Sequence, residues 1–176
     1  LKCYFLTNQL PILIYDFNSK DPVFHTRTHK DDILFKQTED IFFPPKKFVL
    51  SYARCNKPFQ SVFYCSENRP TSFMELVEYW AETTPFKDTF YATTGRWILS
   101  KPLPSILLAY SDKEKRKSEY DKFFGEYLDS AIEQMEDDKR EGTILFYNYI
   151  IEKFRMPAKN DLKTYLITSA YCNAVL

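Results

Sequence analysis

The spacing of apolar residues divides the chain into a strand-rich part and a helical part. Short apolar or alternating runs, typical of strands, occupy residues 10–16, 23–29, 48–52, 61–65 and 105–110, and residues 87–99 have the pattern of a β-hairpin. Apolar residues at helical spacing follow Pro70 and recur over residues 120–141, 143–156 and 161–176. This order predicts an α+β fold with a mixed or antiparallel sheet and a helical last third.

The length of 176 residues fits one domain, which we expect to span residues 1–176, with a helical insertion at about 112–157. Residues 30–47 lack periodicity and end in Pro44-Pro45, so they predict an irregular loop. The chain begins with Leu1 and ends at Leu176 within a helical pattern. We therefore expect it to be incomplete at both ends.

The helix that follows Pro70 has the clearest start signal. Ser72 is a suitable N-cap residue, and Glu75 follows it at the spacing of a capping box. Gly142 is expected to end the later helix that begins near residue 120. The apolar stripe of the helix after Pro70 consists of Phe73, Leu76, Val77 and Trp80.

Charge and cysteine content narrow the possible partners. The 24 Lys and Arg residues balance 24 Asp and Glu residues, which argues against a nucleic-acid partner or an anionic membrane surface. The apolar runs are too short for a membrane span. Cys3, Cys55, Cys65 and Cys172 form no CxxC motif and no cluster with histidine, so no metal is expected. Scattered thiols are typical of a reduced, cytoplasmic setting, although a disulfide between Cys55 and Cys65 stays possible.

Strand 23–29 carries the first candidate binding residues. Alternation predicts Phe24, Thr26 and Thr28 on one face and His25, Arg27 and His29 on the other. The second set could line an anion pocket, or it could be a solvated strand edge. A zinc site formed by His25 and His29 is not favoured, because ligands at positions i and i+4 converge on a helix and not on a strand.

Four residues near the ends of predicted elements could form a nucleotide site: Arg27, Arg54, Tyr64 and Glu75. Arginines can clamp a diphosphate through bidentate hydrogen bonds, and a tyrosine can stack on a flat ring. A carboxylate can bind ribose and stabilise positive charge during glycosidic cleavage. The alternative is that the four residues have no common role. No Walker, dinucleotide-binding or GxSxG motif is present.

The chain resembles the RES domain family, the toxins of RES–Xre toxin–antitoxin modules and related larger proteins. Residues 161–176 resemble the family segment that precedes a late strand with a serine, which would lie beyond Leu176. The residues that carry the resemblance are Thr26-Arg27-Thr28, Arg54, Asn56, Phe59, Val62-Phe63-Tyr64, Ser66, Glu75 and Tyr165-Leu166-Ile167-Thr168-Ser169.

The resemblance implies an ADP-ribosyltransferase-like fold and degradation of NAD at the nicotinamide–ribose bond, by hydrolysis or phosphorolysis. Arg27 and Arg54 would bind the phosphates of NAD, Tyr64 would contact its nicotinamide end, and Glu75 would serve the ribose and the transition state. An antitoxin or another regulatory protein would be a partner. Two alternatives stay open: transfer of ADP-ribose to a macromolecule, and a non-catalytic interaction module.

Overall fold

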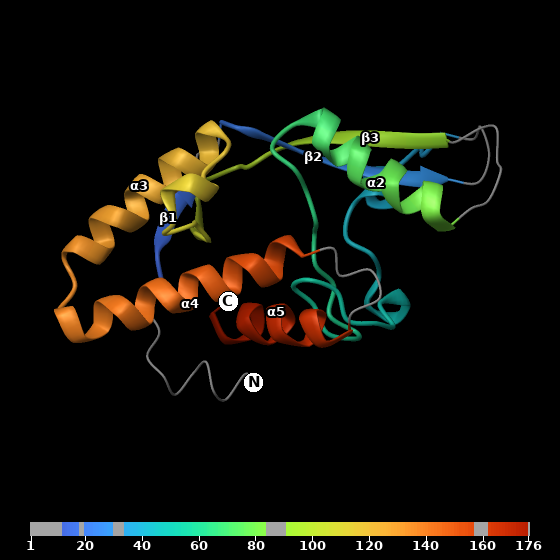
Figure 1. Cartoon of the computed structure of the whole chain (residues 1–176). Helices are drawn as coiled ribbons and strands as arrows, with labels where there is room; N and C mark the ends of the chain where they lie inside the picture. The colour runs from blue at the N-terminus through green and yellow to red at the C-terminus, as the bar shows by residue number, and fades with distance from the viewer. Residues whose placement is uncertain (1–11, 18–19, 30–33, 84–90, 157–161, 176) are drawn as a thin grey trace. The chain divides into compact units, whose positions relative to one another are not determined.

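The chain has an α+β fold, with helices and two small antiparallel sheets (Figure 1). The computed structural model describes residues 12–17, 20–29, 34–83, 91–156 and 162–175. In chain order its α-helices, 3-10 helices (η) and strands are β1 (Ile14–Phe17), β2 (Pro22–His29), η1 (Thr38–Ile41), η2 (Lys46–Phe48), α2 (Arg69–Thr83), β3 (Tyr91–Ile98), β4 (Leu103–Ile106), η3 (Lys113–Lys115), α3 (Glu119–Glu133), α4 (Asp137–Arg155) and α5 (Leu162–Val175).

The chain divides into two compact units. Unit 1 consists of Leu1–Tyr15, Val49–Gln60 and Pro104–Leu176, and unit 2 consists of Asp16–Phe48 and Ser61–Leu103. Strand β1 pairs with β4, and β2 pairs with β3. The expectation of a single domain over the whole chain, with its helical insertion, stays a prediction.

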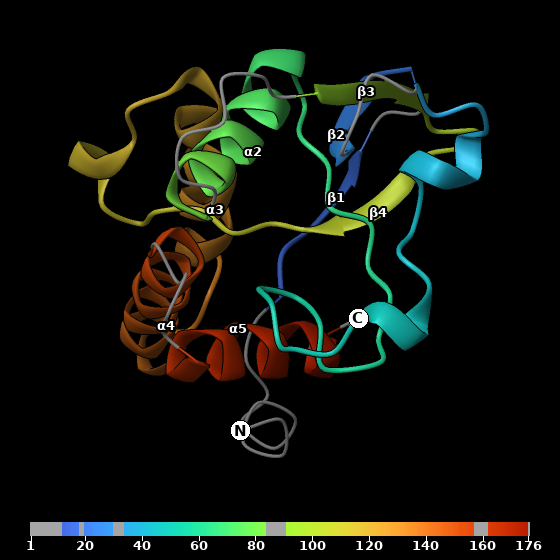
Figure 2. The same ribbon diagram turned by 90° about the vertical axis from the view of Figure 1, so that its right-hand side faces the viewer.

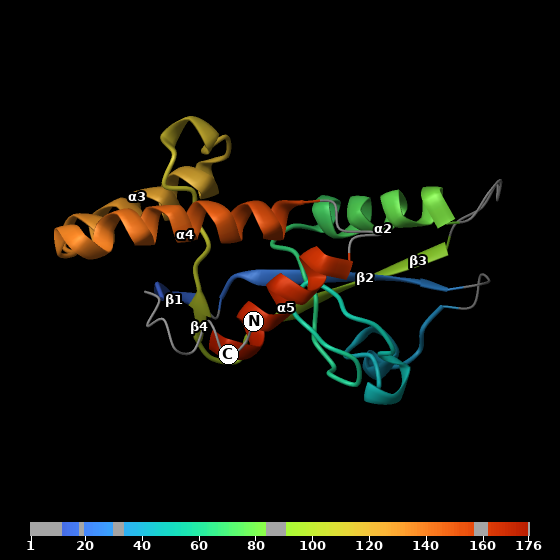
Figure 3. The ribbon, with the colours of Figure 1, turned by 60° about the horizontal axis from the view of Figure 1, so that its bottom comes forward.

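Unit 2 is built on the antiparallel β2–β3 ribbon. The ribbon pairs Pro22 with Ile98 at one end and His29 with Tyr91 at the other. Helix α2 covers one face of the ribbon, and η1 lies on the opposite face (Figures 2 and 3). The prediction of a strand at 23–29 is confirmed.

Helix α2 begins earlier than the sequence pattern predicts. Arg69 is its first residue, and the side chain of Asn68 accepts a hydrogen bond from the Thr71 amide at 2.8 Å. Asn68 therefore caps the helix. The predicted capping box is wrong, because Ser72 lies inside the helix with its hydroxyl turned into unit 2. Of the predicted stripe, Leu76 and Val77 are half-buried and Phe73 is exposed, while the Trp80 side chain lies outside the described residues.

Two predicted strands, at residues 48–52 and 61–65, are wrong, because neither segment forms a strand ladder. Residues 48–52 form the end of η2 and then a loop. Residues 61–65 are extended but join β2 only through the bridge between Ser66 and Phe24. The pattern at 87–99 predicted a hairpin with its turn near Thr94-Gly95, and residues 87–90 lie outside the described residues. In the described part that turn is wrong, because Gly95 is the middle of the continuous strand β3, where a Cβ atom would lie 2.7 Å from Ile41 Cδ1. Gly95 is therefore required for close packing and not for a turn.

Unit 1 buries its core between helices α3, α4 and α5 and two loop segments. Leu128 and Tyr147 are fully buried, and the Leu13 amide donates a hydrogen bond to the Tyr147 hydroxyl at 3.1 Å. Residues 107–110 pass through this core without strand pairing, so the predicted strand 105–110 is confirmed only in its first residues, where β4 ends. Helix α5 agrees with the prediction for 161–176.

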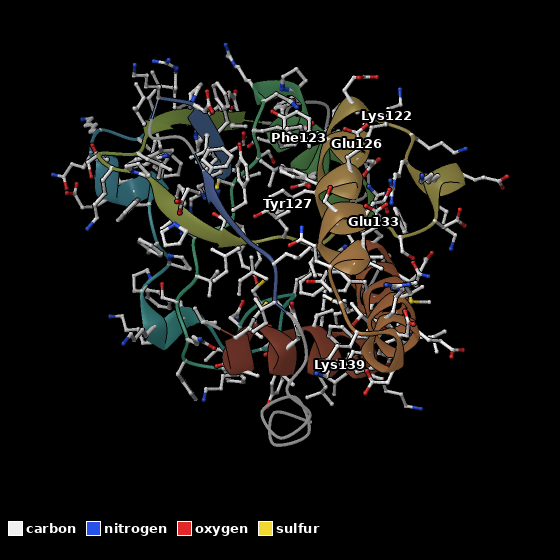
Figure 4. The ribbon with its side chains drawn as sticks, turned by 90° about the vertical axis from the view of Figure 1, so that its left-hand side faces the viewer. Lys122, Phe123, Glu126, Tyr127, Glu133 and Lys139 are labelled. Carbon is white, nitrogen blue, oxygen red and sulfur yellow. The ribbon has the colours of Figure 1, made fainter. Side chains whose placement is uncertain are left out.

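The break between α3 and α4 lies at residues 134–136 and not at Gly142, which is exposed within α4. The charged run that leads into α3 is solvated, as its alternating signs predict. Lys122 and Glu126, for example, are both exposed (Figure 4). Arg116 is the exception, because its side chain is only 4% exposed.

Arg116 is held by a set of hydrogen bonds that satisfies its guanidinium group. It pairs with both carboxylate oxygens of Asp129 at 2.7 and 2.8 Å and donates to the carbonyls of Tyr110 and Ser111. The pKa of Asp129 is lowered, chiefly by this pairing. Gly125 makes room for Arg116, since a Cβ atom at Gly125 would lie 2.2 Å from Arg116 Nε.

We predict that Gly125→Ala destabilises unit 1 by about 2 kcal/mol, because the new methyl group displaces a buried, paired arginine. Gly142→Ala is the matched control, since nothing lies within 4 Å of a Cβ atom there. It should stabilise the chain by about 0.5–1 kcal/mol through helix propensity. Urea unfolding measures both changes, and equal stabilisation by the two variants would contradict the packing described for Gly125.

Candidate functional site

Arg27 projects from β2 toward the face of the ribbon that η1 occupies. Its Nη1 donates a hydrogen bond to the Asp40 carbonyl at 2.7 Å. His25 and His29 share this face, where their rings contact Phe63 and Phe35 respectively. The predicted alternation along β2 is therefore confirmed. The bond to Asp40 uses one of the five N–H groups of Arg27. The same bond joins η1 to the ribbon.

Burial makes the positively charged form of His25 less favourable on this face. Its pKa is lowered, first by burial and also by the nearby charge of Arg27, although a hydrogen bond with the Tyr64 backbone opposes both effects. The ring centroid of His25 lies 5.1 Å from that of Phe63, within a cluster that also contains Phe42 and Trp97. The anion pocket expected from His25, Arg27 and His29 stays a prediction, as does its alternative, a solvated strand edge.

Thr26 faces the other way and connects the ribbon to α2. Its hydroxyl is 2.7 Å from the Ser72 hydroxyl and 2.9 Å from the Thr94 hydroxyl. Thr26 and Ser72 are both buried. Buried hydroxyl groups are costly without partners, so this trio fixes where α2 sits along β2.

Glu75 lies one helical turn beyond Ser72 on α2 and is exposed. In the described part of unit 2 it forms no ion pair with Arg27. Helix α2, which carries Glu75, and η1 lie on opposite faces of the ribbon (Figure 3). The Arg27 side chain is bonded on the η1 face.

Tyr64 belongs to a segment that is joined to β2 by one bridge. Its segment runs along the edge of β2 that β3 does not occupy, where the backbone of Ser66 exchanges hydrogen bonds of 2.7 and 2.8 Å with Phe24. The Tyr64 side chain is 39% exposed. We use the name β2 edge for the three elements that carry Arg27, Tyr64 and Glu75, namely β2, residues 61–66 and α2.

Arg54 belongs to unit 1 and is already engaged there. Its Nη1 donates a hydrogen bond to the carbonyl of Phe154, in the last turn of α4. Carbonyl groups in the last turn of a helix lack helical partners and attract cations. Arg54 therefore has a clear structural role as a partner of the α4 C-terminus. The binding role expected for Arg54 stays a prediction.

Comparison of the chain with models of protein families, with curated proteins and with solved structures found no match. Among the described residues, no group of three His, Cys, Asp or Glu side chains is placed to hold a metal ion. None of the described helices is long and apolar enough to cross a membrane.

The sequence pattern indicated the faces of β2 but not the partners of its side chains. The role of Thr26 had a weak signal, namely a threonine on the inward face of a strand near the serine of the next helix. The Asp40 and Phe154 carbonyls had none, because any residue supplies a backbone carbonyl. Both hydrogen bonds depend on the three-dimensional positions of η1 and of the last turn of α4.

We predict that Thr26→Val destabilises unit 2 by about 1–3 kcal/mol, because it deprives the buried Ser72 hydroxyl of its partner. Thr28→Val is the control on the same strand and face, where the side chain is exposed, and it should change stability by less than about 0.5 kcal/mol. Thermal unfolding followed by circular dichroism compares the two variants. A Thr26→Val variant as stable as Thr28→Val would show that the hydroxyl trio does not hold α2.

Proposed function

We propose that the chain degrades NAD by cleaving the bond between nicotinamide and ribose. The observation that supports the proposal is that two elements are hydrogen-bonded to β2, the strand that carries Arg27. The segment of Tyr64 is joined to it through Ser66 and Phe24, and helix α2, which carries Glu75, through Ser72 and Thr26. The resemblance suggests both the substrate and the three side chains that would contact different parts of it.

Cleavage of the nicotinamide–ribose bond requires mainly that these side chains supply charge and hydrogen bonds at suitable positions. Arg27 has free N–H groups for a phosphate oxygen, and Tyr64 offers an exposed ring for the nicotinamide end. Glu75 stabilises the positive charge that develops on the ribose as the bond to nicotinamide breaks. The electron pair of that bond leaves with nicotinamide, and water or phosphate then adds to the sugar carbon and loses a proton.

Arg54 enters the proposal differently. For its guanidinium to bind a phosphate of NAD, other N–H groups must be used or the bond to the Phe154 carbonyl must be exchanged. An Arg54→Ala variant would also remove a partner of the α4 C-terminus, so lost activity would have two explanations. Glu75 and Arg27 are therefore the more informative positions.

The biological role that we propose is that of a toxin or defence effector. Loss of NAD harms the cell that contains the enzyme, so activity must be held in check, and an antitoxin or another regulatory protein would do so. Such an enzyme would act in the cytoplasm, where NAD is abundant.

The test is release of nicotinamide from NAD by the purified chain, followed by chromatography. We predict that Glu75→Gln lowers kcat about 100-fold or more, since the charge it removes acts mainly in the transition state. Arg27→Lys keeps the charge but loses the planar fork, so it should raise KM about tenfold. Glu126→Gln, an exposed helical glutamate in unit 1, is the control and should leave both constants unchanged.

Two other outcomes would replace the proposal. Nicotinamide release together with ADP-ribose bound covalently to protein or nucleic acid would indicate an ADP-ribosyltransferase. No release over hours from the folded chain would favour an interaction module. Equal rates for Glu75→Gln and Glu126→Gln would remove Glu75 from the site.

A further inference from the structure

The loop Val49–Gln60 in unit 1, which we call the Arg54 loop, is compact and closed on itself. The Phe59 amide donates a hydrogen bond to the Val49 carbonyl at 2.7 Å, and Phe59 takes a left-handed backbone with φ of 63°. Inside the loop Asn56 is buried, and its side-chain amide donates to the Ser51 carbonyl at 3.3 Å. These bonds give the loop a defined shape.

Two contacts hold the Arg54 loop against the helices of unit 1. Arg54 donates to the Phe154 carbonyl of α4, and the neighbouring Cys55 forms a thiol–thiol hydrogen bond with Cys172 of α5. The loop lies beside α5 in two views (Figures 1 and 2). Cys172 is buried, whereas Cys55 is only half-buried. Of the two residues, Cys55 is the more exposed to solvent.

We propose that Cys55 and Cys172 are a redox-active thiol pair that forms a disulfide and thereby fixes the Arg54 loop to α5. Neither cysteine is in a disulfide in this structure. The two thiols interact directly, and a disulfide between them needs an S–S bond of about 2.05 Å. This inference does not depend on the proposed cleavage of NAD.

The environment assigns each thiol a step in the reaction with a small-molecule disulfide such as oxidised glutathione. The hydrogen bond from Cys172, with help from the charge of Arg54, lowers the pKa of Cys55, while the same bond and burial raise the pKa of Cys172. Cys55 is therefore the attacking thiolate. It bonds to one sulfur of oxidised glutathione and releases one glutathione thiolate.

The second step closes the pair. Cys172 gives its proton to solvent or to the departing thiolate, attacks the Cys55 sulfur and releases the second glutathione. In the balance, two protein thiols are oxidised and one molecule of oxidised glutathione is reduced to two of glutathione. The new bond joins segments that are more than one hundred residues apart in sequence, and closing so long a loop restricts the unfolded chain.

The experiment equilibrates the full chain with mixtures of oxidised and reduced glutathione, followed by acid quenching, alkylation and peptide mass spectrometry. We expect a cross-linked peptide pair containing Cys55 and Cys172, with the intact chain lighter by two hydrogen atoms. The oxidised chain should unfold at a Tm about 5 °C or more above the reduced chain.

Variants separate this pair from the other thiols. Cys65→Ser, which removes an exposed thiol in unit 2, is the control and should leave the disulfide intact. Cys172→Ala should yield glutathione attached to Cys55 instead of a cross-link, and Cys55→Ser should leave Cys172 unmodified in the folded chain. Reduced Cys55 and Cys172 throughout the wild-type series, or a cross-link from Cys55 to Cys3 or Cys65, would overturn the proposal.

Discussion

The arrangement of unit 2 depends on the hydrogen bonds of the Thr26 hydroxyl group. It lies within hydrogen-bond distance of Ser72 on α2 and Thr94 on β3, so one buried atom connects a strand, its neighbour and the helix above them. Since hydrogen bonds are directional, the trio specifies the position of α2 along the ribbon more sharply than apolar contact could. The place of Glu75 follows from it, one turn farther along the helix.

The two arginines expected to bind phosphate are both bonded to backbone carbonyls. Arg27 joins η1 to the ribbon, and Arg54 joins its loop to the end of α4. A guanidinium group has five N–H donors, so one such bond positions the side chain and leaves other N–H groups that can bind a ligand. Structural and binding roles can therefore coincide in one residue. The same holds for the Arg54 loop, whose two helix contacts involve adjacent residues, Arg54 and Cys55.

Sequence patterns correctly predicted elements whose apolar residues keep one regular spacing along the chain. Strand β2 and helix α5 were predictable because alternation and helical periodicity are unbroken over 23–29 and 161–176. The prediction of a strand at residues 61–65 was wrong. The run is rich in residues that favour strands, but Phe63 packs into a side-chain cluster instead of lying in a sheet. Gly95 and Gly142 look like turn residues, yet one permits the approach of Ile41 and the other sits exposed in a helix. Likewise, no sequence pattern predicted the partners of Arg54 and Cys55, because these partners lie on helices far away in the sequence.

The central claim is that the β2 edge binds NAD. Amide hydrogen exchange of the full chain, measured with and without NAD by mass spectrometry, tests it most directly. We predict slower exchange with NAD in residues 61–66 and in the first turns of α2, with little change in α3. Unchanged exchange along the β2 edge at saturating NAD, or protection confined to α3 and α4, would contradict it.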